Sequence, residues 1–324
     1  MHRILFATML AVATAAFWIG CSEPKRTDPA SSEVSLARPI YQFAISTDSG
    51  LLATIGMQRV IRVQKLATRQ TVHTLAYGNR RPIFVAFRAD ENALLAVYHD
   101  GSIVLWNDLV GNAPRRNELF TLPGNLTAAY CSNDWRIAVV DKDNVLSIRD
   151  RDSQRWQRSF SSRDWISHLS FSPDGRSLLS CGFLSGVRIW NVDTGAYTTL
   201  AGSRGLRIRS ARYSPDGRRI VTAGFDGRVR EWNARDGSQL WSKQHCNMPL
   251  TAVCYTPDGR SIVVGTYDGE VFLCENSSPQ STCVVSTHAS AVTQLEFTPD
   301  GTLHFSTQGG ELVSLRLDEA RNCD

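Results

Sequence analysis

One short turn motif recurs along the chain at a fixed spacing. Its four clearest copies read SPDG or TPDG and lie at 172–175, 214–217, 256–259 and 298–301. Successive aspartates of these copies are 42 residues apart. Weaker copies continue the series towards the N-terminus around Asp134, Asp90 and Asp48. A fixed period of about 40 residues is typical of a repeat architecture, and the series here has seven units.

Each unit reads as four short β-strands separated by tight turns. In SPDGRRIVTAGFDGRVREWN (214–233), Pro and Asp-Gly favour the first turn, because Pro fixes φ and Gly accepts a positive φ. A β-rich stretch, a second Asp-Gly turn and a third stretch ending at Trp232 follow, and a looser strand precedes the next unit. Four such strands describe one blade. The sequence therefore predicts an all-β fold, a seven-bladed β-propeller of four-stranded antiparallel blades.

The units resemble WD (tryptophan–aspartate) repeats over residues 31–317. The Trp-Asp pair of the family is Trp-Asn in three units, at Trp106–Asn107, Trp190–Asn191 and Trp232–Asn233. The other units carry Val63–Gln64, Arg149–Asp150, Cys274–Glu275 and Leu315–Arg316 at that place. The resemblance implies a hydrogen-bond network in each blade, of which Thr222, Asp226 and Trp232 remain. It also assigns structural roles to Trp106, Trp190, Asp100, Asp143 and Asp268.

The ring must close, because an open ring would leave exposed strand edges that invite aggregation. The last unit supplies only three strands, at about 291–297, 302–308 and 311–317, before a short tail at 318–324. The stretch SSEVSLARP at 31–39 precedes the first inner strand, where a fourth strand belongs. We therefore expect this N-terminal strand to pair with the last blade and close the propeller.

The first 21 residues differ from the rest of the chain. A short basic start is followed by an apolar run from Ile4 to Ile19, which suits the core of a signal peptide better than a spanning helix. The run ends at Gly20–Cys21 and resembles a bacterial lipoprotein signal, which implies lipidation of Cys21. Residues 22–30 read as a flexible tether. We expect an exported protein anchored by lipid at the cell envelope; a cleaved soluble signal and an uncleaved anchor are the alternatives.

The net charge and the cysteine positions limit the partners and cofactors to be expected. The chain has 35 Lys and Arg against 31 Asp and Glu, a net charge of +4 without a basic cluster, which argues against nucleic acid as a partner. No zinc-site spacing occurs among the eight cysteines, and no other metal or cofactor is indicated. Cys274 and Cys283 fall on adjacent predicted strands and could form a disulfide if the register permits.

The repeats explain most residues that might otherwise suggest catalysis, so function is expected at the surface. In the family, the residue before the second-turn aspartate points out from one rim. The matching and neighbouring residues proposed to bind a partner are His99, Trp165, Phe183, Phe225 and Tyr267. Aromatic side chains dominate interface hot spots. We expect a monomeric, non-catalytic platform for a protein or peptide partner.

Two other functions stay open at this point. A hydrolase or lyase would need His or acidic side chains converging on the central channel, where His168 and His304 are the only histidines in predicted strands. An intracellular scaffold held by an N-terminal anchor is the third possibility, and free thiols throughout would favour it.

Overall fold

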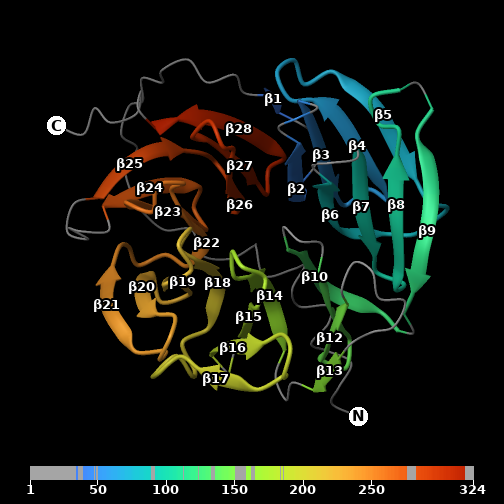
Figure 1. Ribbon diagram of the computed structural model, residues 1–324. Coiled ribbons are helices and arrows are strands. Elements are labelled where there is room, and N and C mark those ends of the chain that lie inside the picture. The colour runs from blue at the N-terminus through green and yellow to red at the C-terminus, as the bar shows by residue number, and fades with distance from the viewer. Residues whose placement is uncertain are drawn as a thin grey trace, which may run out of the picture. The chain divides into compact units, whose positions relative to one another are not determined.

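The computed structural model describes residues 34–35, 39–46, 48, 50–88, 92–111, 113–122, 124–132, 136–149, 158–161, 165–182, 184, 186–275 and 282–317. These residues form seven four-stranded antiparallel sheets arranged as a ring (Figure 1). The sheets belong to one compact unit, Ser32–Asp324. The predicted all-β, seven-bladed propeller is confirmed. In the described residues no helix is long and apolar enough to span a membrane.

The strands, in chain order, are β1 (Val34–Ser35), β2 (Ile40–Ser46), β3 (Leu51–Gly56), β4 (Val60–Lys65), β5 (Thr71–Ala76), β6 (Pro82–Arg88), β7 (Ala93–Tyr98), β8 (Ser102–Asn107), β9 (Arg115–Thr121), β10 (Leu126–Cys131), β11 (Ile137–Asp141), β12 (Val145–Arg149), β13 (Arg158–Ser161), β14 (Ile166–Phe171), β15 (Ser177–Gly182), β16 (Val187–Asn191), β17 (Tyr197–Thr199), β18 (Ile208–Tyr213), β19 (Arg219–Gly224), β20 (Arg228–Asn233), β21 (Gln239–Gln244), β22 (Leu250–Tyr255), β23 (Ser261–Thr266), β24 (Glu270–Glu275), β25 (Thr282–Thr287), β26 (Val292–Phe297), β27 (Thr302–Thr307) and β28 (Glu311–Arg316). Blades 1 to 6 each take four consecutive strands, starting from β2–β5, and blade 7 takes β26–β28 with β1.

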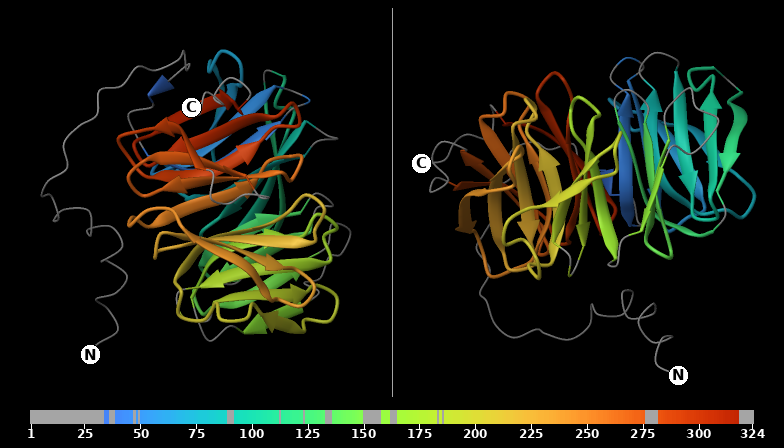
Figure 2. Two further views of the ribbon diagram at one scale, coloured as in Figure 1. Left: turned by 90° about the vertical axis from the view of Figure 1, so that its left-hand side faces the viewer. Right: turned by 60° about the horizontal axis from the view of Figure 1, so that its bottom comes forward.

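The hydrophobic core lies between neighbouring blades. Ile55 and Val63 of blade 1, for example, pack in one cluster with Leu94 and Val104 of blade 2. Both side views in Figure 2 show the blades standing face to face around the centre. Because each sheet is covered on both faces, its middle strands are continuous apolar runs rather than alternating ones; β7 is buried at every position.

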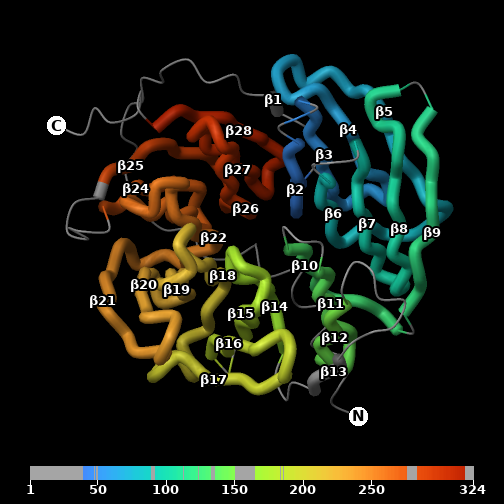
Figure 3. Tube along the Cα trace, viewed as in Figure 1, coloured from blue at the N-terminus to red at the C-terminus, as the bar shows by residue number. Residues whose placement is uncertain are grey.

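The first strand of each blade lies innermost, around the centre of the ring (Figure 3). Each of these inner strands has a register shift after its first residue, as between Ile208 and Ser210 in β18. Such a β-bulge leaves one residue unpaired and redirects its side chain. In β18 the bulged residue is Arg209.

The ring closes where the sequence predicted. Val34 and Ser35 in β1 pair antiparallel with Leu312 and Glu311 in β28. Side chains also hold the seam between blades 7 and 1. Gln294 accepts a hydrogen bond from the backbone N–H of Phe43 (2.9 Å) and donates one to its carbonyl (3.1 Å). This exchange reproduces the pair of hydrogen bonds that two backbone residues make in a sheet.

The predicted placement of the family pair in unit 1 was wrong by one residue. Leu52 pairs with Gln64 in blade 1 as Ile220 pairs with Trp232 in blade 5. Gln64, and not Val63, therefore occupies the tryptophan position. The Gln64 side chain is buried and donates a hydrogen bond to the carbonyl of Arg69 (2.8 Å).

The predicted disulfide between Cys274 and Cys283 does not form. Cys274 is a free thiol, whereas Cys283 is in a disulfide. In the β24–β25 register Cys274 pairs with Thr282, so the next residue, Cys283, points to the opposite face of the sheet. The Cys274 sulfur instead lies 3.4 Å from Nε2 of His245.

Candidate interaction face and central channel

One face of the propeller, here called the upper face, is built from the second turn of each blade and the links between blades. Backbone hydrogen bonds join these two kinds of segment. The N–H of His99 donates to the carbonyl of Arg81 (2.9 Å), that of Phe225 to Arg207 (3.1 Å), and that of Tyr267 to Pro249 (2.9 Å). These three residues are thus anchored through their backbones, and the side chains of Phe225 and Tyr267 are exposed.

Exposed apolar side chains gather on this face over three adjacent blades. The set comprises Trp165 (48% exposed), Leu184 (71%), Phe225 (37%), Met248 (37%) and Tyr267 (41%), and is called the upper apolar patch below. Blade 4 contributes Trp165 and Leu184, blade 5 contributes Phe225, and blade 6 with its preceding link contributes Tyr267 and Met248. Exposed apolar side chains on one face of adjacent blades make this face a candidate interaction site.

One of the predicted contact residues lies on another blade, and a second lies outside the described residues. His99 is only partly exposed and belongs to blade 2, which is not adjacent to blades 4–6. Phe183 lies outside the described residues, as does Cys21. Leu184, the residue after Phe183, stands where other blades have the second-turn aspartate. Exposure at 71% makes Leu184 the most exposed member of the patch.

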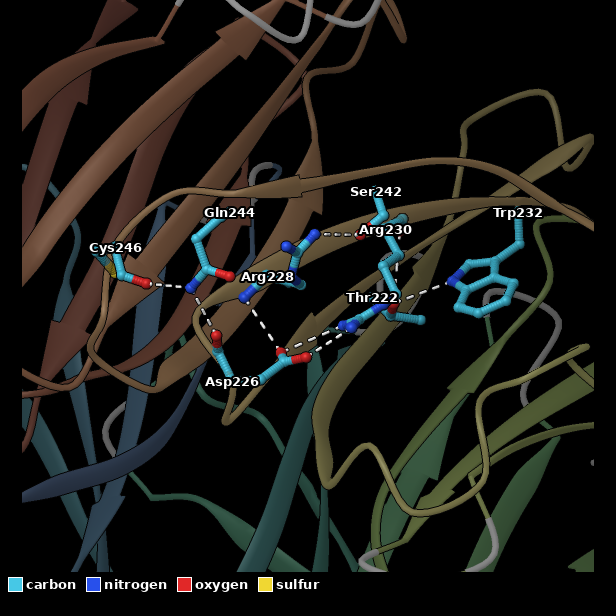
Figure 4. Close-up of polar contacts among 8 residues, drawn as sticks. All are labelled: Thr222, Asp226, Arg228, Arg230, Trp232, Ser242, Gln244 and Cys246. Atoms are coloured by element: carbon cyan, nitrogen blue, oxygen red, sulfur yellow. Dashed lines mark hydrogen bonds and ion pairs between the residues drawn. The ribbon is translucent and has the colours of Figure 1, made fainter.

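The turn that carries Phe225 is held by a polar network (Figure 4). Asp226 accepts hydrogen bonds from both terminal nitrogens of Arg230, the shorter at 2.6 Å. Gln244 on the outer strand donates to the carbonyls of Asp226 (2.7 Å) and Cys246 (2.6 Å). The network ties the turn to strands β20 and β21, so Phe225 is presented with little conformational freedom to lose on binding.

The buried tryptophans use their indole N–H groups within their own blades. Each donates to a hydroxyl on the second strand, namely Thr222 for Trp232 (3.0 Å), Ser180 for Trp190 (2.8 Å) and Tyr98 for Trp106 (3.4 Å). Figure 4 shows Asp226 bonded to Arg230 rather than to Thr222. In blade 5 the network therefore runs through Arg230, because Thr222 donates to the carbonyl of Arg230 (3.4 Å) and the guanidinium of Arg230 donates to Asp226.

The other second-turn aspartates differ among themselves. Asp100 accepts a hydrogen bond from the N–H of Ser102 (3.1 Å), and Asp268 accepts one from the hydroxyl of Thr266. Asp143 is exposed, and its side chain forms an ion pair with Lys142. Asp141 accepts the backbone N–H groups of Asp143 (2.8 Å) and Val145 (3.0 Å) instead. In blade 3 the turn is therefore stabilised by Asp141.

A buried carboxylate joins blades 5 and 6, and sequence reasoning missed it. Glu231 in β20 has no exposed surface. It accepts hydrogen bonds from Arg219 (3.0 Å) and Trp241 (2.8 Å) of its own blade, and from the hydroxyl of Tyr255 (2.9 Å) in β22. Burial, and then the nearby negative charge of Glu231, raise the pKa of Tyr255, so its hydroxyl stays protonated and can donate.

The ionisable side chains on the inner strands include His168 (β14), Arg212 (β18) and Glu296 (β26). A terminal nitrogen of Arg212 donates to Nε2 of His168 (2.9 Å). Burial, reinforced by Arg212 and Arg209, holds the pKa of His168 well below its usual range. Burial raises the pKa of Glu296 to about 7, against the opposing effects of Arg212 and a hydrogen bond from Gln294.

His304 does not join this group. It lies on β27, the second strand of blade 7, and is buried between the hydroxyls of Ser314 (2.8 Å) and Thr298 (3.3 Å). In the described part of the chain, no three or more His, Cys, Asp or Glu side chains group so that they could hold a metal ion.

The repeat units of this chain are similar to those of known proteins. The family described as "WD domain, G-beta repeat" matches residues 155–191, 196–233 and 237–274. The second match begins just before β17, the outer strand of blade 4, and ends with the third strand of blade 5. One sequence repeat therefore spans two blades, and neighbouring blades are linked covalently through it.

Three curated proteins are similar to part of the chain. A WD repeat-containing protein 26 homolog of Arabidopsis thaliana is 28% identical over 160 residues, 48% of this chain and 26% of that protein. Protein tipD of Dictyostelium discoideum is 26% identical over 51% of this chain and 27% of its own length. Polyadenylation factor subunit 2 of Candida albicans is 26% identical over 34% and 20%, respectively. The matched segment spans about a quarter or less of each relative. Repeat pattern, ring and matches agree: the chain forms a seven-bladed β-propeller, and three of its segments match the WD repeat.

Proposed function

We propose that this protein is a non-catalytic interaction platform that binds a protein or peptide partner on the upper apolar patch. The observation that carries the proposal is the exposure of Phe225 and Tyr267 on backbone-anchored turns of adjacent blades. Large aromatic side chains on a rigid frame contribute much buried area at little entropic cost. Proteins with WD repeats commonly bind protein partners, and one matched relative is named as a subunit of a larger factor.

A double variant tests the patch. Phe225→Ser with Tyr267→Ser should reduce recovery of the specific partner in affinity capture by at least about tenfold, because hot-spot aromatics contribute about 2 kcal/mol or more each. The matched control is Leu240→Ser with Val284→Ser, which removes two exposed apolar side chains from the outer strands β21 and β25. Unchanged capture by a folded Phe225/Tyr267 variant would remove the proposal.

We further propose that the platform acts at the cell envelope on the non-cytoplasmic side, held by lipid on Cys21. The support is the sequence at 1–21, an apolar run with a basic start that ends at Gly20–Cys21. Membrane fractionation and intact mass of the wild type beside Cys21→Ala check this. A new N-terminus with the mass gain of a diacylglyceryl group, lost in the variant, is expected. An unprocessed chain without lipid would favour the anchored intracellular scaffold.

A further inference from the structure

The inner strands of blades 4 and 5, β14 and β18, carry side chains that can donate more hydrogen bonds than they make. Arg209 is the bulged residue of β18, and Arg212 follows three residues later on the same inner strand. Arg212 contacts His168 (2.9 Å), the carbonyl of Leu169 (3.4 Å) and the ring of Tyr130 (5.1 Å to its centroid). In the described part of the chain, neither guanidinium has a carboxylate within ion-pair distance.

His168 adds another donor that lacks an acceptor. Arg212 can only donate, so Nε2 of His168 accepts and the ring proton of the neutral imidazole resides on Nδ1. This Nδ1 is buried and has no hydrogen-bond partner in the described residues. A buried donor without an acceptor destabilises the fold, because it has lost its hydrogen bonds to water. The fold thus keeps an unsatisfied N–H donor beside two cationic side chains. This arrangement is expected of a site that a bound ligand completes.

The surroundings are enclosed but reached by solvent. Arg209 is exposed, and Arg212 and His168 are partly exposed. Burial nevertheless lowers the pKa of Arg209 as well as that of His168. These side chains are therefore in contact with water on one side and packed against other protein groups on the other. Charge–charge attraction is stronger there than at an open surface.

We propose that Arg209, Arg212 and His168 form a binding site for an oxyanion, a carboxylate or a phosphate-like group, at the inner strands β14 and β18. An oxyanion is all acceptor, and planar guanidinium groups bind such oxygens in pairs. The group could belong to a small solute or to an acidic side chain of a docked chain. This site is separate from the upper apolar patch, so either proposal can fail alone.

Calorimetric titration with sodium sulfate, at an ionic strength held constant with chloride, tests the site. The variant is Arg209→Gln, because Arg209 makes no hydrogen bond that the fold needs. The matched control is Arg204→Gln, an exposed arginine on the link before the same strand. We expect Arg209→Gln to raise the Kd for sulfate at least about tenfold and Arg204→Gln to change it less than twofold. Equal effects of the two variants, or no sulfate binding to the wild type, would overturn the proposal.

A second arm identifies the source of the anion. A blocked peptide of alternating Glu and Ala is titrated in parallel with sulfate. Binding of the peptide at least tenfold tighter than sulfate, lost in Arg209→Gln, assigns the site to an acidic side chain of a docked chain. Binding no tighter than sulfate assigns it to a small solute. Phe225→Ser with Tyr267→Ser should leave sulfate binding unchanged, which separates this site from the docking surface.

Discussion

Replacing Glu231 by alanine should lower the free energy of unfolding by about 3 kcal/mol. The carboxylate is fully buried and accepts three donors, from Arg219, Trp241 and Tyr255. Arg219 is half exposed and can turn to water when its partner is lost. The cost therefore falls on the indole N–H and the tyrosine O–H, at about 1–3 kcal/mol for each unsatisfied buried group.

The contact with Tyr255 makes this a test of blade-to-blade coupling. Glu231 and Tyr255 lie on different blades, so the loss should extend beyond blade 5. Urea unfolding followed by tryptophan fluorescence measures it, with Glu275→Ala as the control. Glu275 is exposed at the end of the third strand of the next blade, and its loss should change stability by no more than about 0.5 kcal/mol. A Glu231 variant as stable as this control would show that the buried carboxylate does not couple the blades.

The blade number and the ring closure could be predicted because both follow from the period of the sequence. A fixed repeat of turn motifs sets how many sheets form, and the shortage of one strand at the C-terminal end requires one from the N-terminal end. Where a unit lacks the tryptophan of its third strand, the sequence gives no fixed position from which to align that strand with those of the other units. Gln64 is such a case, and its true position emerged only from the strand register.

Contacts between elements could not be predicted in the same way. Asp141 and Asp143 are both placed to stabilise the turn of blade 3, and only the backbone geometry shows that Asp141 does so. Glu231 looks like an ordinary strand residue, since its partner Tyr255 is 24 residues away on another blade. Likewise, the bulge that separates Arg209 from the regular alternation of β18 has no sequence signal.

Replacing Glu296 by glutamine should stabilise the protein at neutral and higher pH and have no effect near pH 4. Burial raises the pKa of Glu296 to about 7 in the folded chain, against about 4.3 when unfolded. The folded state thus holds the proton more tightly, and the stability of the wild type falls as pH rises from about 4.3 to about 7. Glutamine cannot ionise, so the variant avoids this loss.

The expected gain is about 2 kcal/mol above pH 8, less than the full pKa shift implies because the Glu296 side chain is partly exposed to solvent. Urea midpoints of both proteins from pH 4 to pH 8.5 measure it, and groups that titrate in both, such as His245 and His304, cancel in the difference. A variant less stable than the wild type at pH 8 would show that ionised Glu296 is stabilised by Arg212 after all.

The ionisation of Glu296 should also control how tightly the proposed site binds an oxyanion. In the described residues, the charged or titratable groups that act on one another in this region are Arg209 and Arg212 on β18, His168 on β14, Cys181 on β15, Cys254 on β22 and Glu296 on β26. Burial raises the pKa of both thiols to about 12, and His168 stays neutral, so Glu296 alone changes charge between pH 6 and pH 8. Its ionisation partly compensates the guanidinium charge and competes with a bound anion. Sulfate should therefore bind the wild type more tightly at pH 6 than at pH 8, and Glu296→Gln should remove that dependence.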